Sequence, residues 1–212
     1  MLILFAYTSR SRAERVVWVL NELGLEYKII RLNYANITNK ESPEYKQLSL
    51  VNPNLKVPVL VHAHGNQEFI LTESLAICQY LYKLKSRDLL SDPKEEARLY
   101  ERIYFCVSEI ESNLWMLDQS IHIKRYDLNT HTIDNLIQVV QNNISTVERW
   151  IEGYACGNTF TLLDVLCYHL LTWASMYSIT INEKTREYLA LLESRPSCPE
   201  LMKRAGSHTN IM

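Results

Sequence analysis

Tyr7, Ser9 and Ser11 carry hydroxyl groups in "YTSRSRAER", where the first predicted strand passes into the first predicted helix. A hydroxyl at the start of a helix can donate its proton to an anion, and the positive end of the helix dipole stabilises the same anion. Ser11 also has a structural alternative, because with Glu14 it fits a capping box. The two roles are compatible, and the stretch predicts an anion site.

A proline interrupts the predicted strand in "VNPNLKVPVL", residues 51–60. Proline cannot donate to a sheet ladder, so Pro58 belongs at an edge or a bulge. A cis peptide would turn the Val57 backbone outward to a ligand; an ordinary trans edge proline is the alternative, since only about one X–Pro bond in twenty is cis. Glu73 and Ser74 stand where another helix begins, and its unpaired N–H groups favour an anion there.

The elements that must position these residues alternate between strand and helix over the first eighty residues. A strand "LILFAY" precedes a helix "SRAERVVWVLNELG", which is predicted to open with the Ser11–Glu14 capping box and to stop at Gly24. A strand "YKIIRLN", an irregular helical connector "ESPEYKQLS", a hairpin of "VPVLVHA" and "EFILT" across "HGNQ", and a helix "SLAICQYLYKL" follow. This order predicts a small α/β domain with a mixed four-stranded sheet.

Beyond this domain only helical periodicity is present, so the fold class is α/β followed by all-α. We expect a first domain over 1–83, a polar linker over 84–93 and an all-helical domain over 94–212. In the second domain Thr161 and Asp164 can cap each other at a helix start, with Phe160 as a hydrophobic staple, which gives Asp164 a structural role. The predicted helices are 94–120, 132–152, 161–178, 183–193 and 198–206.

The composition is that of an ordinary globular protein. The 212 residues include 22 basic and 24 acidic side chains, so the net charge of −2 favours neither nucleic acid nor an acidic tail. The apolar runs are too short to span a bilayer. The five scattered cysteines form no C-x-x-C pair, His62 and His64 lie near no cysteine, and the other histidines are isolated, which predicts reduced, buried thiols in a cytosolic protein and no metal.

Four segments in the right order resemble the cytosolic glutathione S-transferases over nearly the whole chain. They are "SRAERVVWVLNELGLEY", "VNPNLKVPVL", "LTESLAICQYL" and "YACGNTFTLLDVLCYHLLTWA". The resemblance implies a thioredoxin-like domain that binds glutathione, followed by a helical bundle that contributes the electrophile site. Leu55 stands where the family usually has glycine, and Leu163 replaces an alanine.

The family must convert the thiol of glutathione to a thiolate near neutral pH. The loop "YTSRSRAER" has no cysteine, so it resembles the serine-dependent branches, theta- or delta-like or a related bacterial or fungal branch. By this resemblance Ser11 is the activating hydroxyl, with Ser9 and Tyr7 as alternatives.

The resemblance also implies a role for each residue of the glutathione site. The Val57 backbone would pair with the cysteinyl part after a cis Pro58, Glu73 and Ser74 would hold the γ-glutamyl end, and Lys56 would contact the glycyl carboxylate.

The implied function is conjugation of the glutathione thiolate to small hydrophobic electrophiles, as in detoxification. Glutathione is then a co-substrate, no metal is needed, and a cytoplasmic homodimer without nucleic-acid or membrane partners is expected. Two alternatives stay open. One is glutathione-dependent isomerase or peroxidase chemistry, and the other is a non-catalytic, transferase-like binding or regulatory protein.

Overall fold

The computed structural model describes residues 1–85 and 92–203. These residues divide into two compact units, residues 1–85 with 196–203, and residues 92–195. Most of the predicted linker, 84–93, falls on residues 86–91, which lie outside the described ranges. The domain limits 1–83 and 94–212 stay a prediction, and the packing adds that residues 196–203 belong to the first unit.

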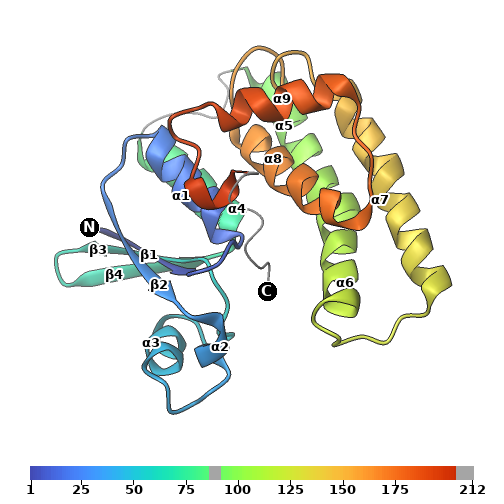
Figure 1. The fold of residues 1–212 in the computed structure, drawn as a ribbon. Helices are drawn as coiled ribbons and strands as arrows, with labels where there is room; N and C mark the ends of the chain where they lie inside the picture. Colours follow the sequence, from blue (N-terminus) through green and yellow to red (C-terminus); the bar gives the residue numbers. More distant parts are fainter. Residues whose placement is uncertain (86–91, 204–212) are drawn as a thin grey trace. The chain divides into compact units, whose positions relative to one another are not determined.

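Four strands of six residues form the sheet of the first unit (Figure 1): β1 (Leu2–Tyr7), β2 (Tyr27–Leu32), β3 (Val59–His64) and β4 (Gln67–Thr72). Their order is β2-β1-β3-β4, with β1 parallel to β2 and the other two pairs antiparallel. The predicted mixed four-stranded sheet is confirmed. The hairpin turn is shorter than predicted, because His64 and Gln67 still pair with each other.

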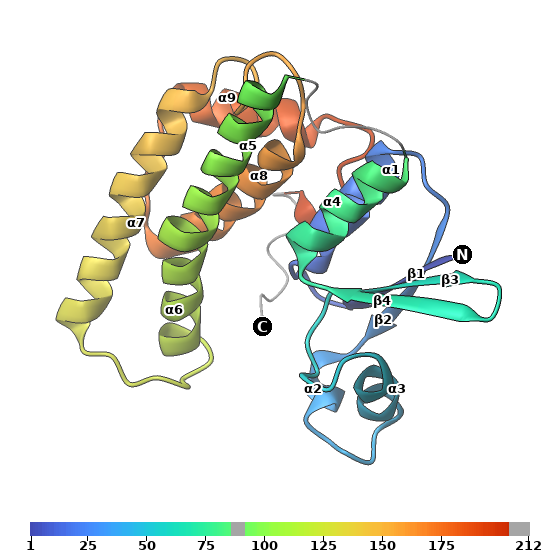
Figure 2. The same cartoon turned by 180° about the vertical axis from the view of Figure 1, so that it is seen from behind.

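Helices cover both faces of this sheet. α1 (Ala13–Glu22) and α4 (Ser74–Leu84) lie on one face, and α2 (Tyr34–Ile37) and α3 (Pro43–Val51) lie on the other (Figures 1 and 2). Burying each large apolar side chain contributes roughly 1.5–3 kcal/mol, so the cluster on the α2–α3 side fixes the two short helices to the sheet. Its members are Phe5, Leu32, Ile37, Leu48, Val59 and Val61.

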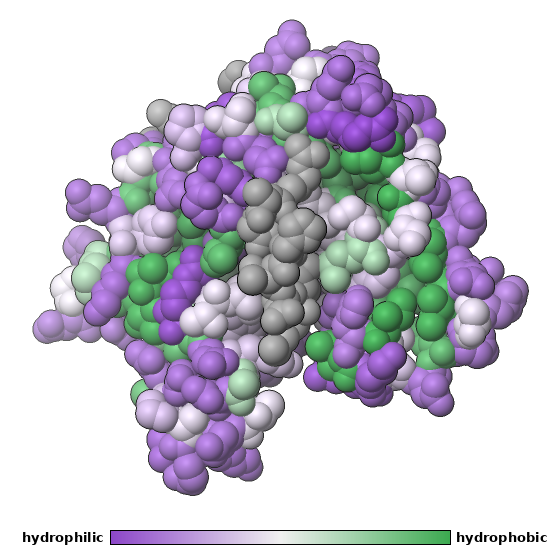
Figure 3. All heavy atoms as spheres, in the orientation of Figure 1, coloured by the Kyte–Doolittle hydropathy of each residue, from purple (hydrophilic) through white to green (hydrophobic). Residues whose placement is uncertain are grey.

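The connector between β2 and β3 is more regular than its sequence predicts. Asn33 caps α2 and Ser42 caps α3, each by accepting a backbone hydrogen bond with its side chain, and Pro43 opens α3. The portion of the surface over these two helices is mostly hydrophilic in Figure 3, at the bottom of the view. Two caps and a proline at the first helical position favour helix even where the apolar pattern is weak.

The start of α1 differs from the prediction. Arg12, not Ser11, occupies the N-cap position. The predicted capping box is wrong, because the Ser11 hydroxyl accepts from the Ala13 N–H at 3.3 Å while the Glu14 carboxylate pairs with Arg31 of β2. The Arg31 guanidinium is charged and binds both carboxylate oxygens, whereas a capping box offers one backbone N–H, so Glu14 turns to the sheet.

The end of α1 follows the prediction. Gly24 has a φ of 58°, a left-handed conformation that glycine adopts without steric cost. Its N–H donates to the Asn21 carbonyl at 3.1 Å, and the Leu25 N–H donates to the Leu20 carbonyl at 3.0 Å. This pair of bonds is a Schellman motif, and it directs the chain into β2.

The second unit is helical in its described residues. The predicted helix 94–120 forms as α5 (Pro93–Phe105) and α6 (Ser112–Ile121), with a π-helical turn, η1 (Cys106–Glu111), between them. Then follow α7 (Thr130–Trp150), α8 (Leu162–Ala174), the 3-10 turn η2 (Ser175–Tyr177) and α9 (Glu183–Glu193). Every residue of α8 is buried, so the other helices of this unit pack around it.

The predicted cap of α8 is confirmed. The Thr161 side chain accepts from the helix backbone, and the Asp164 carboxylate accepts from the Thr161 N–H at 2.7 Å. Asp164 also accepts from the Ala155 N–H at 2.7 Å and from the Tyr188 hydroxyl at 2.8 Å. The buried carboxylate therefore joins the preceding loop, α8 and α9.

The predicted last helix, 198–206, is only a 3-10 turn, η3 (Glu200–Met202), in its described part; residues 204–206 lie outside the described ranges. Pro199 occupies its N-cap position. The segment lies against α1, where Ser197 accepts from the Trp18 indole at 3.1 Å and from the Asn21 amide at 3.2 Å.

Candidate functional site

The register of the sheet brings the predicted site segments to one end of it. Phe5, near the end of β1, pairs with Val59, and Val59 pairs with Thr72, the last residue of β4. The loop after β1, the turn before β3 and the start of α4 therefore meet at the same sheet end. This placement was expected from the resemblance alone, because the three segments are far apart in the sequence.

The loop after β1 presents the Ser11 hydroxyl at the start of α1. Ser11 is half-buried, and its oxygen accepts one bond, from the Ala13 N–H. No acceptor for its proton is present among residues 1–85 and 92–203. Ser9 lies in the same loop and is also half-buried. The Ser11 hydroxyl thus has a proton to donate next to the positive end of a helix.

Tyr7 is engaged elsewhere. Its hydroxyl donates to the Leu55 carbonyl at 3.3 Å, and its ring packs edge-on against Tyr34 with centroids 5.2 Å apart. Burial, and to a smaller extent Tyr34, raises the pKa of the Tyr7 phenol to about 12. The phenol therefore stays protonated, and its proton is directed to the turn before β3.

That turn has an unusual backbone. Leu55 has a φ of 53°, the left-handed region in which the family places glycine. The buried Asn52 holds the turn: its carbonyl accepts from the Leu55 N–H and its side-chain amide donates to the Lys56 carbonyl, both at 2.9 Å. The turn thus keeps a glycine-like conformation with a leucine in it.

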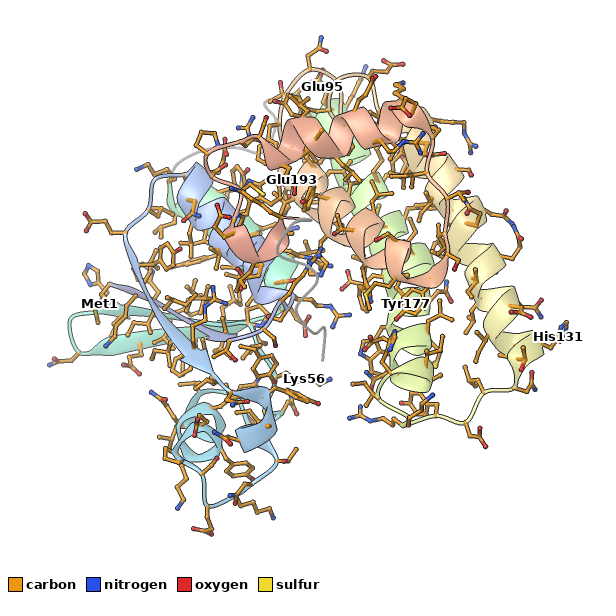
Figure 4. All side chains as sticks on the ribbon, in the orientation of Figure 1. Met1, Lys56, Glu95, His131, Tyr177 and Glu193 are labelled. Atoms are coloured by element: carbon orange, nitrogen blue, oxygen red, sulfur yellow. The ribbon has the colours of Figure 1, made fainter. Side chains whose placement is uncertain are left out.

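The turn leads into a cis peptide between Val57 and Pro58. Neither the N–H nor the C=O of Val57 has a hydrogen-bond partner in the part of the chain that the structure describes, since the β3–β4 pairing begins at Val59. Lys56 is exposed beside it (Figure 4). This backbone is an unpaired strand edge of the kind that an extended peptide can join.

The third segment is the start of α4. Glu73 has a φ of 66° and is exposed, whereas Ser74, the first helical residue, is only 5% exposed. The buried Arg15 of α1 donates to the Ser74 hydroxyl at 3.5 Å. The first N–H groups of a helix lack helical partners, so this start can hold a carboxylate, with Arg15 adding positive charge.

Two contacts of this site are absent from the sequence analysis. One is the Arg15–Ser74 bond, and the other is the pair of Glu14 with Arg31. The residues of each pair are remote in the sequence, so no local motif signals them. The only sign of these two contacts in the sequence is a charged residue on the apolar face of α1.

The cysteine thiols give no sign of reactivity. Cys78, Cys106, Cys167 and Cys198 are buried and free, and Cys156 is half-buried and free. Burial raises the pKa of Cys78 to about 12, although Arg15 lowers it to a smaller extent. A thiol with so high a pKa is a poor nucleophile.

Neither a metal-binding cluster nor a membrane-spanning helix is present in residues 1–85 and 92–203. No group of three or more histidine, cysteine, aspartate or glutamate side chains within residues 1–85 and 92–203 is arranged to hold a metal ion. Within the same ranges, no helix combines the length and the apolar character that crossing a membrane requires.

Comparisons with known proteins identify relatives of this chain. Residues 1–83 match the family model described as glutathione S-transferase, N-terminal domain. The glutathione S-transferase GstA of Escherichia coli O157:H7 is 25% identical over 195 residues, which cover 88% of this chain and 90% of that protein.

Two fungal proteins named URE2 are 30% identical to the chain. Protein URE2 of Candida glabrata matches over 155 residues, 70% of this chain and 41% of that protein. The transcriptional regulator URE2 of Saccharomyces cerevisiae matches over 129 residues, 58% of this chain and 34% of that protein. The matches thus span less than half the length of these URE2 proteins.

A solved structure has the same fold over almost the whole chain. It is a glutathione transferase family member from Pseudomonas fluorescens with two glutathione molecules bound, and it superposes with a TM-score of 0.77 at 18% identity over 95% of this chain and 92% of that one. The predicted thioredoxin-like domain followed by a helical domain is confirmed.

Proposed function

We propose that the chain belongs to the glutathione S-transferase family, whose N-terminal domain model matches residues 1–83, and that it binds glutathione at this sheet end and transfers its thiolate to small hydrophobic electrophiles. The observation that carries the proposal is the meeting of three features at one end of the sheet. They are the unpaired Val57 backbone, the start of α4 at the buried Ser74, and the hydroxyl of Ser11. Each of these three features is suited to bind one part of a tripeptide thiol.

Binding is proposed to use backbone and charge together. The Val57 N–H and C=O pair with the cysteinyl residue as an added strand. The N-terminus of α4 with the Ser74 hydroxyl holds the γ-glutamyl carboxylate, and the exposed Glu73 carboxylate takes the ammonium group. Lys56, also exposed, contacts the glycyl carboxylate.

Activation of the thiol is assigned to Ser11. A free thiol has a pKa of about 8.5, so the thiolate is a minority species near neutral pH. A hydrogen bond from the Ser11 hydroxyl and the positive end of α1 both favour the thiolate, and each lowering of the pKa by one corresponds to about 1.4 kcal/mol. The proton leaves to solvent, the sulfur forms a bond to the electrophilic carbon, and the leaving group departs with its electron pair.

The branch and the cellular context belong to the same proposal. With no cysteine in the loop "YTSRSRAER", we assign the chain to the serine-dependent branches. We further propose a homodimer in the cytoplasm, which acts on a small hydrophobic electrophile without nucleic-acid or membrane partners.

A second candidate function has specific support. The transcriptional regulator URE2 of Saccharomyces cerevisiae is 30% identical over 129 residues, a higher identity than that of GstA. The chain is then a binding or regulatory protein that retains glutathione affinity without turnover. The two candidates differ in one measurable step, the formation of the carbon–sulfur bond.

The test measures glutathione binding by calorimetry and conjugation of chlorodinitrobenzene across pH. Ser11→Ala is expected to lower kcat/KM by roughly 10- to 100-fold, because a hydrogen bond to a charged group contributes about 1.5–3 kcal/mol. The same variant is expected to raise the pKa of the bound thiol. Ser9→Ala and Tyr7→Phe are the matched controls and are expected to retain the wild-type thiol pKa.

The outcomes separate the candidates. Wild-type protein that binds glutathione but forms no conjugate would support the regulatory function and overturn the transferase. Absence of glutathione binding would overturn both. A full effect in Ser9→Ala or Tyr7→Phe instead of Ser11→Ala would move the activating role to that residue.

A further inference from the structure

A buried ion pair lies directly behind the loop of the candidate site. Glu14, in the first turn of α1, has a fully buried side chain, and both of its oxygens accept from the Arg31 guanidinium, the second at 3.4 Å. The Arg31 side chain is 28% exposed and reaches Glu14 from β2. A carboxylate without contact with water needs such a partner, because an unpaired buried charge is strongly destabilising.

Arg31 makes one further bond that extends the pair to the loop. The same nitrogen that contacts Glu14 donates to the Tyr7 carbonyl at 2.8 Å. The following residue, Thr8, donates its N–H to the Leu32 carbonyl at 2.9 Å. The loop from Thr8 to Arg12 is thus fixed at its first residues by β2 and at its last by the first turn of α1.

We propose that Arg31 is a positioning residue for glutathione activation: it neutralises Glu14 and holds the two ends of the loop, so that the start of α1 keeps its positive potential towards the bound sulfur. The inference rests on the proposed function and adds to it a residue that does not touch glutathione. No motif of the sequence singled out Arg31.

Glu14 lies in the first turn of α1, where its charge acts directly on the helix dipole. A helix N-terminus carries the equivalent of about +0.5 charge, which an uncompensated carboxylate in its first turn would more than cancel. Other charged and titratable groups lie on the elements packed around the pair. On β2, the pKa of Tyr27 is raised by burial and then by Glu14, and is lowered by Arg31. The other groups are Tyr7 on β1, Arg12 at the N-cap of α1, Arg15 on α1, and Cys78 on α4, which Arg15 faces.

A purely structural role is the competing explanation. A buried ion pair is weak evidence for stability, and a well-packed apolar pair often replaces it without loss. The measured quantity must therefore be one that folding alone does not change. The pKa of the bound thiol, followed by the ultraviolet absorbance of the thiolate, meets this condition.

The experiment compares Arg31→Met, Glu14→Gln and the double variant in the full-length protein with glutathione bound. Arg31→Met leaves Glu14 uncompensated and is expected to lower the thiolate fraction near neutral pH about tenfold, with kcat/KM falling in parallel and recovering at alkaline pH. Glu14→Gln is expected to keep or increase the thiolate fraction. The double variant is expected to recover most of the loss, since both charges are gone.

Two controls accompany these variants. Arg186→Met removes the arginine of an exposed pair with Glu183 on α9 and is expected to leave the thiol unchanged. Arg31→Lys retains the charge, so the thiolate fraction is expected to stay within about twofold of the wild type; it serves if Arg31→Met does not fold.

An unchanged pKa of the bound thiol in Arg31→Met would overturn the inference. The proposed function would still hold in that case if the wild-type protein binds glutathione and turns it over. A double variant as impaired as Arg31→Met would also overturn it, because the effect would then not depend on the Glu14 charge. If Arg31→Met does not fold, a full loss of thiolate in Arg31→Lys overturns the inference, and its retention supports it. Wild-type protein that fails to bind glutathione overturns the proposed function itself.

Discussion

Leu55 has a backbone conformation that side chains with a Cβ rarely adopt. At φ 53° a non-glycine residue carries a steric cost of roughly 1–2 kcal/mol. Three contacts compensate: the Leu55 side chain packs against the core cluster, its N–H donates to Asn52, and its carbonyl accepts from Tyr7. The turn that leads to Val57 is thus maintained by packing where the family uses glycine.

This compensation predicts an inverted order of two substitutions. Leu55→Ala loses the packing and keeps the left-handed strain, whereas Leu55→Gly loses the same packing and releases the strain. We expect Leu55→Gly to have the higher free energy of unfolding, by about 1 kcal/mol, although alanine is ordinarily the more stable of the two. Denaturant unfolding of both variants measures the difference, and an alanine variant as stable as the glycine variant would contradict the strain.

The same residue shows what a sequence pattern can predict. The resemblance identifies the turn and the departure from glycine, but it does not predict the backbone conformation of Leu55. The outcome depends on Asn52, Tyr7 and the core cluster, which reach Leu55 from other elements. A pattern specifies the conformation that is needed, and tertiary contacts decide which residues can adopt it.

Asp164 determines how α8 begins, and it does so with four hydrogen bonds. Each carboxylate oxygen accepts two: one from Ala155 and Tyr188, the other from the Thr161 N–H and its hydroxyl. Asparagine has a similar shape but a single acceptor oxygen. Asp164→Asn therefore leaves two buried donors without an acceptor and is expected to lower the free energy of unfolding by roughly 2–4 kcal/mol.

A double-mutant cycle with Tyr188→Phe checks this assignment. If the tyrosine hydroxyl bonds to the carboxylate, the two substitutions together should cost less than the sum of the single effects. Additive effects would show that the hydroxyl and the carboxylate do not interact. Thermal unfolding with a second probe in the first unit shows whether the loss is confined to the helical unit.

The two predicted helix starts had opposite outcomes for one physical reason. At α8 the capping partners Thr161 and Asp164 are three residues apart, so the motif contains its own hydrogen bonds. At α1 the same spacing separates Ser11 and Glu14, but Arg31 of β2 binds the Glu14 carboxylate more strongly. Local motifs predict helix ends well unless a charged residue from a remote segment binds one of the capping side chains.

At the scale of the whole chain, the succession of strands and helices along the sequence followed from periodicity and the resemblance, whereas remote packing did not. The π turn Cys106–Glu111 interrupts a stretch that reads as one continuous helix. Residues 196–203 return to α1, where Met202 is fully buried in the first unit. Neither feature has a local signal, because each depends on contacts between distant segments.

The last prediction concerns the proposed homodimer, which we expect to form through β4. β4 is an edge strand of the sheet, and its Phe69 and Ile70 side chains are 49% and 40% exposed. Phe69 also packs against Tyr80 of α4 with ring centroids 5.2 Å apart, so an apolar surface extends from the strand onto the helix. Such a surface is typical of an interface between subunits.

We expect the wild-type protein to have twice the 24.8 kDa chain mass in light scattering, and Phe69→Glu to have the mass of one chain. A charge placed in an apolar interface loses its hydration without gaining a partner, which typically weakens association by several kcal/mol. Leu50→Glu is the matched control, because Leu50 is 84% exposed on α3, away from β4. A Phe69→Glu dimer, or dissociation by both variants, would show that the subunits do not associate through this edge.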